Sequence, residues 1–353
     1  MASSTPLFLD GGLGTSLEDK YGFKFDYDTP LWSSHLLVSD QGTLRSCQRD
    51  FGRVPVDIIL TATYQVSIEG FAQTKTPDHP DGIPKSYIPL YLDRAVSIAE
   101  QVKAPNASVA LSLGPYGACM IPSQEYSGQY DAGHSSAEEL LGWHLDRIRL
   151  FDQIINLPNR IGFLAFETVP RLDEIRAIRS LFARSTTSSL GESSILRKNV
   201  PYWISCVFPG TDYTLPDGSS VDQVIEALLA PESPGQLPWG IGINCTQVAK
   251  LPELIRRYHS SVSRLVDAGR LETWPSLLLY PDGTNGEVYD TTTKTWRQPE
   301  NGAAPTAPWE RQLADIVANT LDMQCWRTIV VGGCCKATHA DISKLRSAIL
   351  HIG

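Results

Sequence analysis

The segment Val330-Val331-Gly332-Gly333-Cys334-Cys335 joins a short apolar run to two glycines and two adjacent cysteines. The apolar run predicts a buried strand, and the glycines allow the backbone to break out of the strand before the cysteines. Consecutive residues on a regular strand point to opposite faces, so both cysteines can reach one site only if the strand has ended by Gly333. Side chains just beyond the ends of parallel strands form the active sites of α/β proteins. This position therefore indicates a functional site.

Seven further apolar runs of similar length occur along the chain, each bounded by turn residues. They are nearly continuous rather than alternating, as is typical of strands that are buried on both faces. With the run before the glycines, the eight predicted strands are Leu7–Asp10, Val56–Leu60, Val109–Leu113, Ile161–Phe166, Tyr202–Phe208, Trp239–Asn244, Ser276–Tyr280 and Thr328–Val331.

Helical patterns occupy most of the gaps between these runs. Repeated alternation of strand and helix predicts an α/β protein, a (β/α)8 TIM barrel, with residues 1–353 forming a single domain. Pro122–Ser136 and Ser185–Asn199 are predicted as long loops, the second of them mobile. The predicted helices are Ser86–Lys103, Ala137–Ile155, Arg171–Phe182, Val221–Leu229, Val248–Val266, Pro308–Met323 and His339–Ile349.

Composition and charge narrow the class of protein. The chain of 353 residues is 42% hydrophobic and 20% charged, an ordinary globular balance. Its net charge of −9 argues against nucleic acid or an anionic membrane as a partner. The N-terminal residues lack the basic and apolar regions of a secretory signal, and no apolar run has the length of a membrane helix. We expect a cytoplasmic protein that acts on small molecules.

Seven cysteines, an odd number without a signal peptide, argue against a disulfide framework and for a reducing compartment. A third cysteine, Cys245, follows the predicted strand Trp239–Asn244. If Cys245, Cys334 and Cys335 converge, their three thiolates would hold Zn²⁺ and leave one coordination position open, as in catalytic zinc sites. The alternative is three packed thiols, because a buried cysteine is more often structural than catalytic. No histidine has metal-ligand spacing with these cysteines.

Polar and glycine-rich motifs follow most of the other predicted strands. They are Asp10-Gly11-Gly12-Leu13-Gly14-Thr15, Thr61-Ala62-Thr63-Tyr64-Gln65, Gly114-Pro115-Tyr116-Gly117-Ala118, Phe166-Glu167-Thr168, Gly242-Ile243-Asn244-Cys245-Thr246 and Gly332-Gly333-Cys334-Cys335.

Together these motifs resemble the homocysteine S-methyltransferase family, in order and spacing, from about residue 7 to residue 350. The resemblance implies a zinc-dependent barrel that methylates homocysteine to methionine, with the three cysteines as catalytic zinc ligands. The chain departs from the family pattern after Tyr280-Pro281, where it reads Asp282-Gly283-Thr284-Asn285 in place of the usual Asn-x-Gly-Glu. That difference leaves the role of Asn285 open.

Homocysteine also carries an ammonium and a carboxylate. Glu167, with Asp10, is suited to pair with the ammonium, although Glu167 alone could instead cap the following helix. Backbone amides of Gly11, Gly12 and Leu13, beside Thr15, suit the carboxylate. We include Asn244 among the residues that contact substrate because it directly precedes Cys245.

The methyl donor is cationic in every branch of the family: S-methylmethionine, S-adenosylmethionine or betaine. Aromatic rings are therefore expected around it, and Trp32, Tyr64 and Tyr116 are candidates, with Gln65 as a hydrogen-bonding neighbour. The short single-domain form most resembles the S-methylmethionine branch. The alternatives are a selenol acceptor, a barrel that binds zinc and thiol ligands without turnover, and a lyase or hydrolase whose cysteines are core residues.

Overall fold

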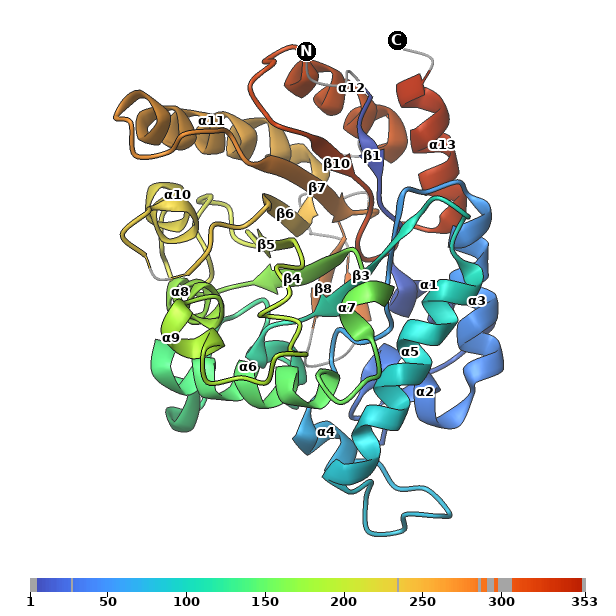
Figure 1. The fold of residues 1–353 in the computed structure, drawn as a ribbon. Coiled ribbons are helices and arrows are strands. Elements are labelled where there is room, and N and C mark those ends of the chain that lie inside the picture. Colours follow the sequence, from blue (N-terminus) through green and yellow to red (C-terminus); the bar gives the residue numbers. More distant parts are fainter. Residues whose placement is uncertain are drawn as a thin grey trace.

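Eight parallel strands form a barrel in a computed structural model that describes residues 5–26, 28–233, 235–284, 287–290, 295–297 and 307–350 (Figure 1). The hydrogen-bonded order is β1-β10-β7-β6-β5-β4-β3-β2, and a parallel bridge between Leu9 and Ile58 joins the two edges. This is the predicted (β/α)8 architecture. The strands are β1 (Leu7–Phe8), β2 (Ile58–Leu60), β3 (Ser108–Leu113), β4 (Phe163–Val169), β5 (Tyr202–Cys206), β6 (Gly240–Gln247), β7 (Ser276–Asp282) and β10 (Ile329–Val331).

A separate antiparallel pair, β8 (Val288–Asp290) and β9 (Thr295–Arg297), follows β7 and was not predicted. Asn285, whose role the sequence left open, lies outside the described residues.

Helices surround the strands, as Figure 1 shows. All seven predicted helices are present to within a few residues at each end. No described helix is long and apolar enough to cross a membrane. The helices are α1 (Leu13–Tyr21), α2 (Leu36–Ser39), α3 (Gln41–Arg53), α4 (Ile68–Gln73), α5 (Ile88–Val102), α6 (Ala137–Phe151), α7 (Leu157–Arg160), α8 (Leu172–Leu181), α9 (Arg184–Thr187), α10 (Val221–Leu229), α11 (Leu251–Asp267), α12 (Trp309–Leu321) and α13 (His339–Leu350).

Two helices between β1 and β2, α1 and α3, were not predicted from the sequence. Helix α1 begins after Gly12, which offers no side-chain cap. Helix α3 buries only a narrow face that includes Leu44, Cys47 and Phe51. The missing cap of α1 and the few apolar positions of α3 make these helices hard to recognise, because tertiary packing supplies most of their stability.

The segment Ser185–Asn199, predicted as a long and mobile loop, consists mostly of turns. It contains α9, and the side chains of Ile195 and Leu196 are buried. The backbone amide of Ile195 donates to Asp152 Oδ1 at 2.9 Å. Burial of apolar side chains and this hydrogen bond therefore fix the segment against the body of the barrel.

The interior of the barrel is filled by one apolar cluster. Its largest member is Trp203, which is fully buried and donates from Nε1 to the Tyr280 hydroxyl at 3.2 Å. Because this layer is packed solid, the ligand-binding space lies above it, at the carboxyl ends of the strands. The cluster consists of Leu9, Ile58, Ala110, Ala165, Trp203, Leu278, Tyr280 and Val330.

Replacement of Trp203 by alanine should destabilise the barrel. The change removes the largest side chain of a fully buried layer and leaves a cavity, which costs about 3–5 kcal/mol. Urea unfolding of Trp203→Ala measures this loss. The matched control is Ile155→Ala, since Ile155 is 80% exposed, and its change should stay within about 0.5 kcal/mol. Equal stability of the two variants would contradict the conclusion that packing of Trp203 in the interior cluster stabilises the barrel.

Candidate functional site

A cavity of about 160 Å³ lies at the carboxyl ends of the strands. Except for Tyr116, the residues predicted to form the site all line it. These are Asp10, Gly11, Gly12, Thr15, Trp32, Tyr64, Gln65, Glu167, Asn244, Cys245, Cys334 and Cys335.

Tyr116 does not line this cavity. Its ring stacks on His134 with 3.8 Å between centroids, and its hydroxyl donates to Asp131. Its backbone amide donates to Glu174 Oε1 at 2.8 Å, which fixes the turn after β3 with the ring directed away. The structure therefore removes Tyr116 from the aromatic residues that can contact a ligand in the cavity.

The three predicted cysteines converge at one point, and Asp282 joins them. The ligand atoms of Cys245, Asp282, Cys334 and Cys335 all lie within 4.8 Å of one another. Asp282 Oδ1 is buried with no hydrogen-bond partner among the described residues. Burial raises the pKa of Asp282 to about 7. Sequence reasoning did not include Asp282 in the cluster, although its position at the end of β7 was a signal.

Cys245 and Cys334 are joined by a disulfide, and Cys335 is a free thiol. The sequence argued against a disulfide framework, and this single pair departs from that expectation for Cys245 and Cys334 only. Thiolates that share one tetrahedral ion lie only about 3.8 Å apart, given Zn–S bonds of about 2.3 Å, so cysteines placed for one metal are also near bonding distance. A metal requires thiolates, and this site can hold one only after reduction.

Two strand ends are shaped by left-handed residues. Thr168 in β4 has φ of 58° and Cys245 in β6 has φ of 45°, and the pairing register shifts at both places. Asn244 connects them: its Oδ1 accepts from the Thr168 amide at 2.8 Å, and its Nδ2 donates to Thr168 Oγ1 at 2.7 Å. Such strained conformations persist where surrounding contacts hold them, and here they turn the Cys245 side chain into the cavity.

Asp10 and Glu167 form a second cluster, of two buried carboxylates. Asp10 Oδ2 accepts from the Leu60 amide at 2.9 Å, while its Oδ1 is buried without a partner among the described residues. Burial raises the pKa of Asp10 well above its ordinary value, and the neighbouring Glu167 carboxylate adds to this rise. Two such groups attract a cation.

The environment of Glu167 excludes its role as a helix cap. Glu167 lies within β4, is 5% exposed, and accepts a hydrogen bond from Ser112 Oγ at 2.5 Å. The cap of α8 is Arg171, without a side-chain bond. Burial raises the pKa of Glu167 to about 7, although hydroxyls of Ser112 and Tyr280 donate to the carboxylate and lower it.

The glycine-rich turn after β1 is only partly available to a ligand. The Gly12 amide donates to the Ala337 carbonyl at 2.9 Å, so it cannot bind the substrate carboxylate as predicted. Thr15 Oγ1 accepts from the Lys336 amide at 2.8 Å. The turn therefore fastens β1 to the segment after the cysteines. Leu13 begins helix α1, whose first-turn amides remain the anion-binding part of this turn.

The loop between β3 and α6 contributes residues that the sequence analysis missed. Glu125 and Tyr126 line the cavity, and the Tyr126 hydroxyl lies 3.9 Å from Cys335 Sγ. Burial raises the pKa of Glu125 to about 7. An acid next to an aromatic residue in the polar segment Pro122–Ser136 was the available signal, but no sequence pattern places this pair inside the barrel mouth.

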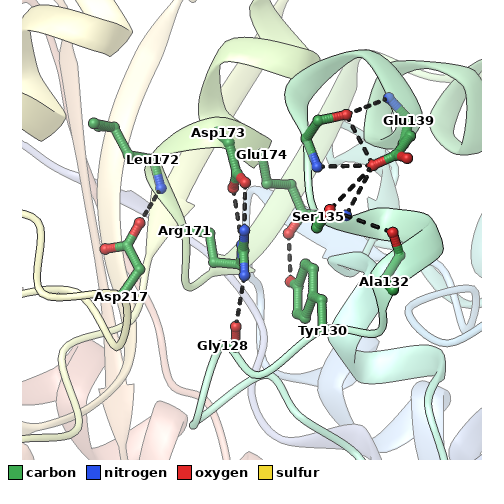
Figure 2. A network of polar contacts seen from close by, with 11 residues as sticks. Gly128, Tyr130, Ala132, Ser135, Glu139, Arg171, Leu172, Asp173, Glu174 and Asp217 are labelled. Carbon is green, nitrogen blue, oxygen red and sulfur yellow. Dashed lines mark hydrogen bonds and ion pairs between the residues drawn. The ribbon is translucent and has the colours of Figure 1, made fainter.

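Figure 2 shows how this loop is fastened. Arg171 donates from Nη1 to the Gly128 carbonyl at 3.0 Å and pairs with Asp173. The Tyr130 hydroxyl donates to Glu174 Oε2 at 2.5 Å. Both contacts join the loop to the start of α8, so the loop is held in place over the cavity.

The charge of the cavity is one-sided. Its described lining contains the carboxylates Asp10, Asp26, Glu125 and Glu167, and no lysine, arginine or histidine is among these lining residues. Ligands of this cavity are therefore cationic, or carry a cationic group. The thiol cluster and the buried acids lie at the carboxyl ends of the strands, where barrel enzymes have their active sites.

Comparison with known proteins identifies the family. A profile described as homocysteine S-methyltransferase matches residues 7–349. The chain is 30% identical over 345 residues to the homocysteine S-methyltransferase of Escherichia coli, covering 97% of this chain and 94% of that one. The chain therefore belongs to the homocysteine S-methyltransferase family, and it is an enzyme that transfers a methyl group to homocysteine.

Other relatives and solved structures agree with this assignment. A betaine-homocysteine S-methyltransferase of Drosophila melanogaster is 26% identical over 353 residues, covering 96% of this chain and 92% of that one. The metallated form of the Escherichia coli homocysteine methyltransferase MmuM superposes with a TM-score of 0.62 at 23% identity, covering 97% of this chain and 96% of that chain. The superposition supports the barrel fold.

Replacement of Ser112 by alanine should raise the pKa of Glu167. The variant loses a hydroxyl that donates to the carboxylate and favours its charged form, while burial is unchanged. Infrared spectra recorded across the pH range follow the protonated carboxyl group of Glu167, and the Glu167→Gln variant identifies its band. The midpoint should lie near pH 7 in the wild type and higher in Ser112→Ala. A midpoint that stays in place would show that this hydroxyl does not act on Glu167.

Proposed function

We propose that the enzyme holds Zn²⁺ on Cys245, Cys334 and Cys335 and moves a methyl group from a sulfonium donor to the thiolate of L-homocysteine, giving methionine. S-methylmethionine is the first candidate donor and S-adenosylmethionine the second. The observation that carries the proposal is the convergence of three cysteine sulfurs with Asp282 at the end of a cavity lined by acids.

The donor atoms of the cluster fit zinc. Soft thiolate sulfurs favour Zn²⁺ among the abundant divalent ions, and four ligand atoms within 4.8 Å suit a tetrahedral ion. The unpartnered Asp282 Oδ1 fits a metal ligand, because a buried polar atom without a partner is costly and a cation would satisfy it. Bound zinc supplies a positive charge that lowers the pKa of a thiol and keeps it deprotonated.

The two buried carboxylates suit the ammonium group of homocysteine. Asp10 Oδ1 is available, and Glu167 lies close enough to raise the pKa of Asp10. A bound ammonium would keep both carboxylates charged, since an opposite charge favours the ionised form. With its ammonium bound between Asp10 and Glu167, homocysteine would extend its thiol toward the three cysteines.

A sulfonium donor suits a cavity without cationic side chains. The rings of Trp32, Tyr64 and Tyr126 line the cavity and offer faces to a cation. As the thiolate attacks the methyl carbon in line, the new S–C bond forms and the old one breaks. The leaving group is a neutral sulfide, so no general acid has to protonate it. Catalysis by these residues consists of positioning and exclusion of water.

The test is methionine formation by the reduced, zinc-loaded protein with homocysteine and one donor at a time. We expect turnover with S-methylmethionine, and none with betaine. In Cys335→Ser, both bound zinc and turnover should fall by more than tenfold, because a three-sulfur site loses a ligand. Cys47→Ser is the matched control, since Cys47 is a free buried cysteine of the core.

Oxidised protein should be inactive until its Cys245–Cys334 disulfide is reduced. Zinc binding without methionine from any donor would instead support a barrel that binds thiol ligands without turnover. Full activity of Cys335→Ser without zinc would overturn the proposal.

Asp282 is proposed as the fourth zinc ligand when no thiol is bound. The carboxylate and the homocysteine thiol then compete for one coordination position. Asp282→Ala should therefore bind zinc about tenfold more weakly and homocysteine more tightly. Competition with a chelator measures the first, and calorimetric titration of the zinc-loaded protein measures the second.

Asp282→Asn keeps the shape of the side chain and an oxygen ligand. Its affinities for zinc and for homocysteine should therefore lie between those of wild type and Asp282→Ala. If the role of Asp282 is purely structural, Asp282→Ala should weaken the binding of both zinc and homocysteine. That outcome would exclude the carboxylate as a ligand.

A further inference from the structure

Glu125 lies in the cavity with an unsatisfied carboxylate oxygen. The side chain is 8% exposed, and its Oε2 is buried with no hydrogen-bond partner among the described residues. Holding a charged carboxylate away from water without a counter-charge is expensive. Burial has raised the pKa of Glu125 to about 7, which is the expected response of a carboxylate that lacks a cation.

The backbone around Glu125 is fixed. The Gln124 amide donates to the Gly117 carbonyl at 2.8 Å, and the Gly128 amide donates to the Gln124 carbonyl at 2.8 Å. Arg171 donates from Nη1 to the Gly128 carbonyl, as Figure 2 shows. These contacts place Glu125 within a turn that is closed on itself and anchored at two points. The backbone at Glu125 is therefore held beside the cavity, where its side chain is buried.

Glu125 lies at the end of the cavity where the sulfur chemistry takes place. Its neighbour in the chain, Tyr126, reaches to within 3.9 Å of Cys335 Sγ with its hydroxyl. The Glu125 carboxylate also acts on the pKa of Tyr64, another ring of the cavity lining. Glu125 is an acid of the lining in addition to Asp10 and Glu167, and the pKa of Tyr64 is raised by both Glu125 and Glu167.

The cavity thus presents Glu125 as an acid beyond the Asp10–Glu167 pair, whereas homocysteine has a single ammonium. A sulfonium donor carries, besides its own ammonium, a positive charge on the reacting sulfur. That sulfur has to lie beside the homocysteine thiol, at the cysteine end of the cavity that Tyr126 reaches. We propose that Glu125 is the counter-charge of the donor's sulfonium group and so selects a charged donor over its neutral sulfide product. This inference rests on the proposed function, because it assigns a residue to the donor named there.

The sulfonium charge of the donor disappears during the reaction. This loss of charge determines how removal of the Glu125 charge should affect KM and kcat. The sulfonium is a full cation in the ground state and becomes a neutral sulfide, so Glu125 stabilises the bound donor more than the transition state. Loss of its charge should therefore affect KM for the donor and leave kcat unchanged or slightly higher. A residue that merely supported the fold would lower kcat as well.

The experiment compares wild type with Glu125→Gln, which keeps the shape and removes the charge. With S-methylmethionine as the varied donor at saturating homocysteine, we expect KM to rise about 30-fold, the size of a lost buried charge contact. The KM for homocysteine and the bound zinc should stay within about twofold. Inhibition by methionine, which lacks the sulfonium charge, should be equally strong in both proteins.

Asp131→Asn is the matched control. Asp131 is an exposed acid of the same loop that bonds Tyr116 outside the cavity, so its variant should keep wild-type kinetics. Thermal unfolding is the second readout: Glu125→Gln without ligand should be at least as stable as wild type, because it removes an unpaired buried charge.

The possible failures are distinguishable. An unchanged KM for S-methylmethionine in Glu125→Gln, with an active wild type, would overturn the role of Glu125 alone. Equal weakening of S-methylmethionine and methionine would assign Glu125 to a group that both ligands share, and would also overturn it. A wild type that makes no methionine from any sulfonium donor would instead overturn the proposed function.

Discussion

The arrangement of the site depends on a close backbone approach at the end of β10. A Cβ atom on Gly333 would lie 2.2 Å from the Ala337 Cβ, and one on Gly332 would lie 2.7 Å from the Leu9 Cβ. No side chain fits at either position, so only glycine allows the end of β10 to pack this closely against Leu9 and Ala337. Because β10 ends at Val331, two consecutive cysteines can face one cavity, where a regular strand would send them to opposite faces.

The same segment also positions the acids. The Gly333 amide donates to the Asp10 carbonyl at 3.1 Å, and the Cys334 amide donates to the Pro281 carbonyl at 2.8 Å. The end of β10 is thereby tied to the ends of β1 and β7, its neighbours in the barrel. The sulfurs, Asp10 and Asp282 are therefore parts of one hydrogen-bonded unit, and a shift in any one strand end would move all of them.

Much of the fold and of the sulfur cluster could be predicted from the sequence because both depend on local patterns. Apolar runs mark strands, and the strand ends of a barrel share one face, so residues such as Glu167 and Cys245 could be placed without coordinates. Tyr116 and Tyr126 show the limit of this reasoning. Both follow β3, yet only Tyr126 enters the cavity, because the loop path is set by contacts of Arg171 and Glu174 from another element.

Asp282 and Gly12 show the same limit in another form. The sequence shows that Asp282 follows an apolar run, but only the pairing of β7 with β10 brings it to the cysteines. Gly12 was predicted to offer its amide to a substrate, and the distant Ala337 carbonyl occupies that amide. In each case a long-range contact decides what a local motif does, and a single sequence does not encode such contacts in a readable pattern.

The buried acids of the cavity connect the geometry of the site with its choice of ligand. Burying Asp10, Glu125 and Glu167 without a cationic side chain among the described lining residues costs stability. That cost is recovered only when cations bind, so the folded protein is stabilised by ligands that carry positive charge and favours them over neutral analogues. The strand ends supply rigid acids and sulfurs, and the anchored loop after β3 supplies a further acid from above. The enzyme thus recognises its substrates largely by the charges that it leaves unpaired.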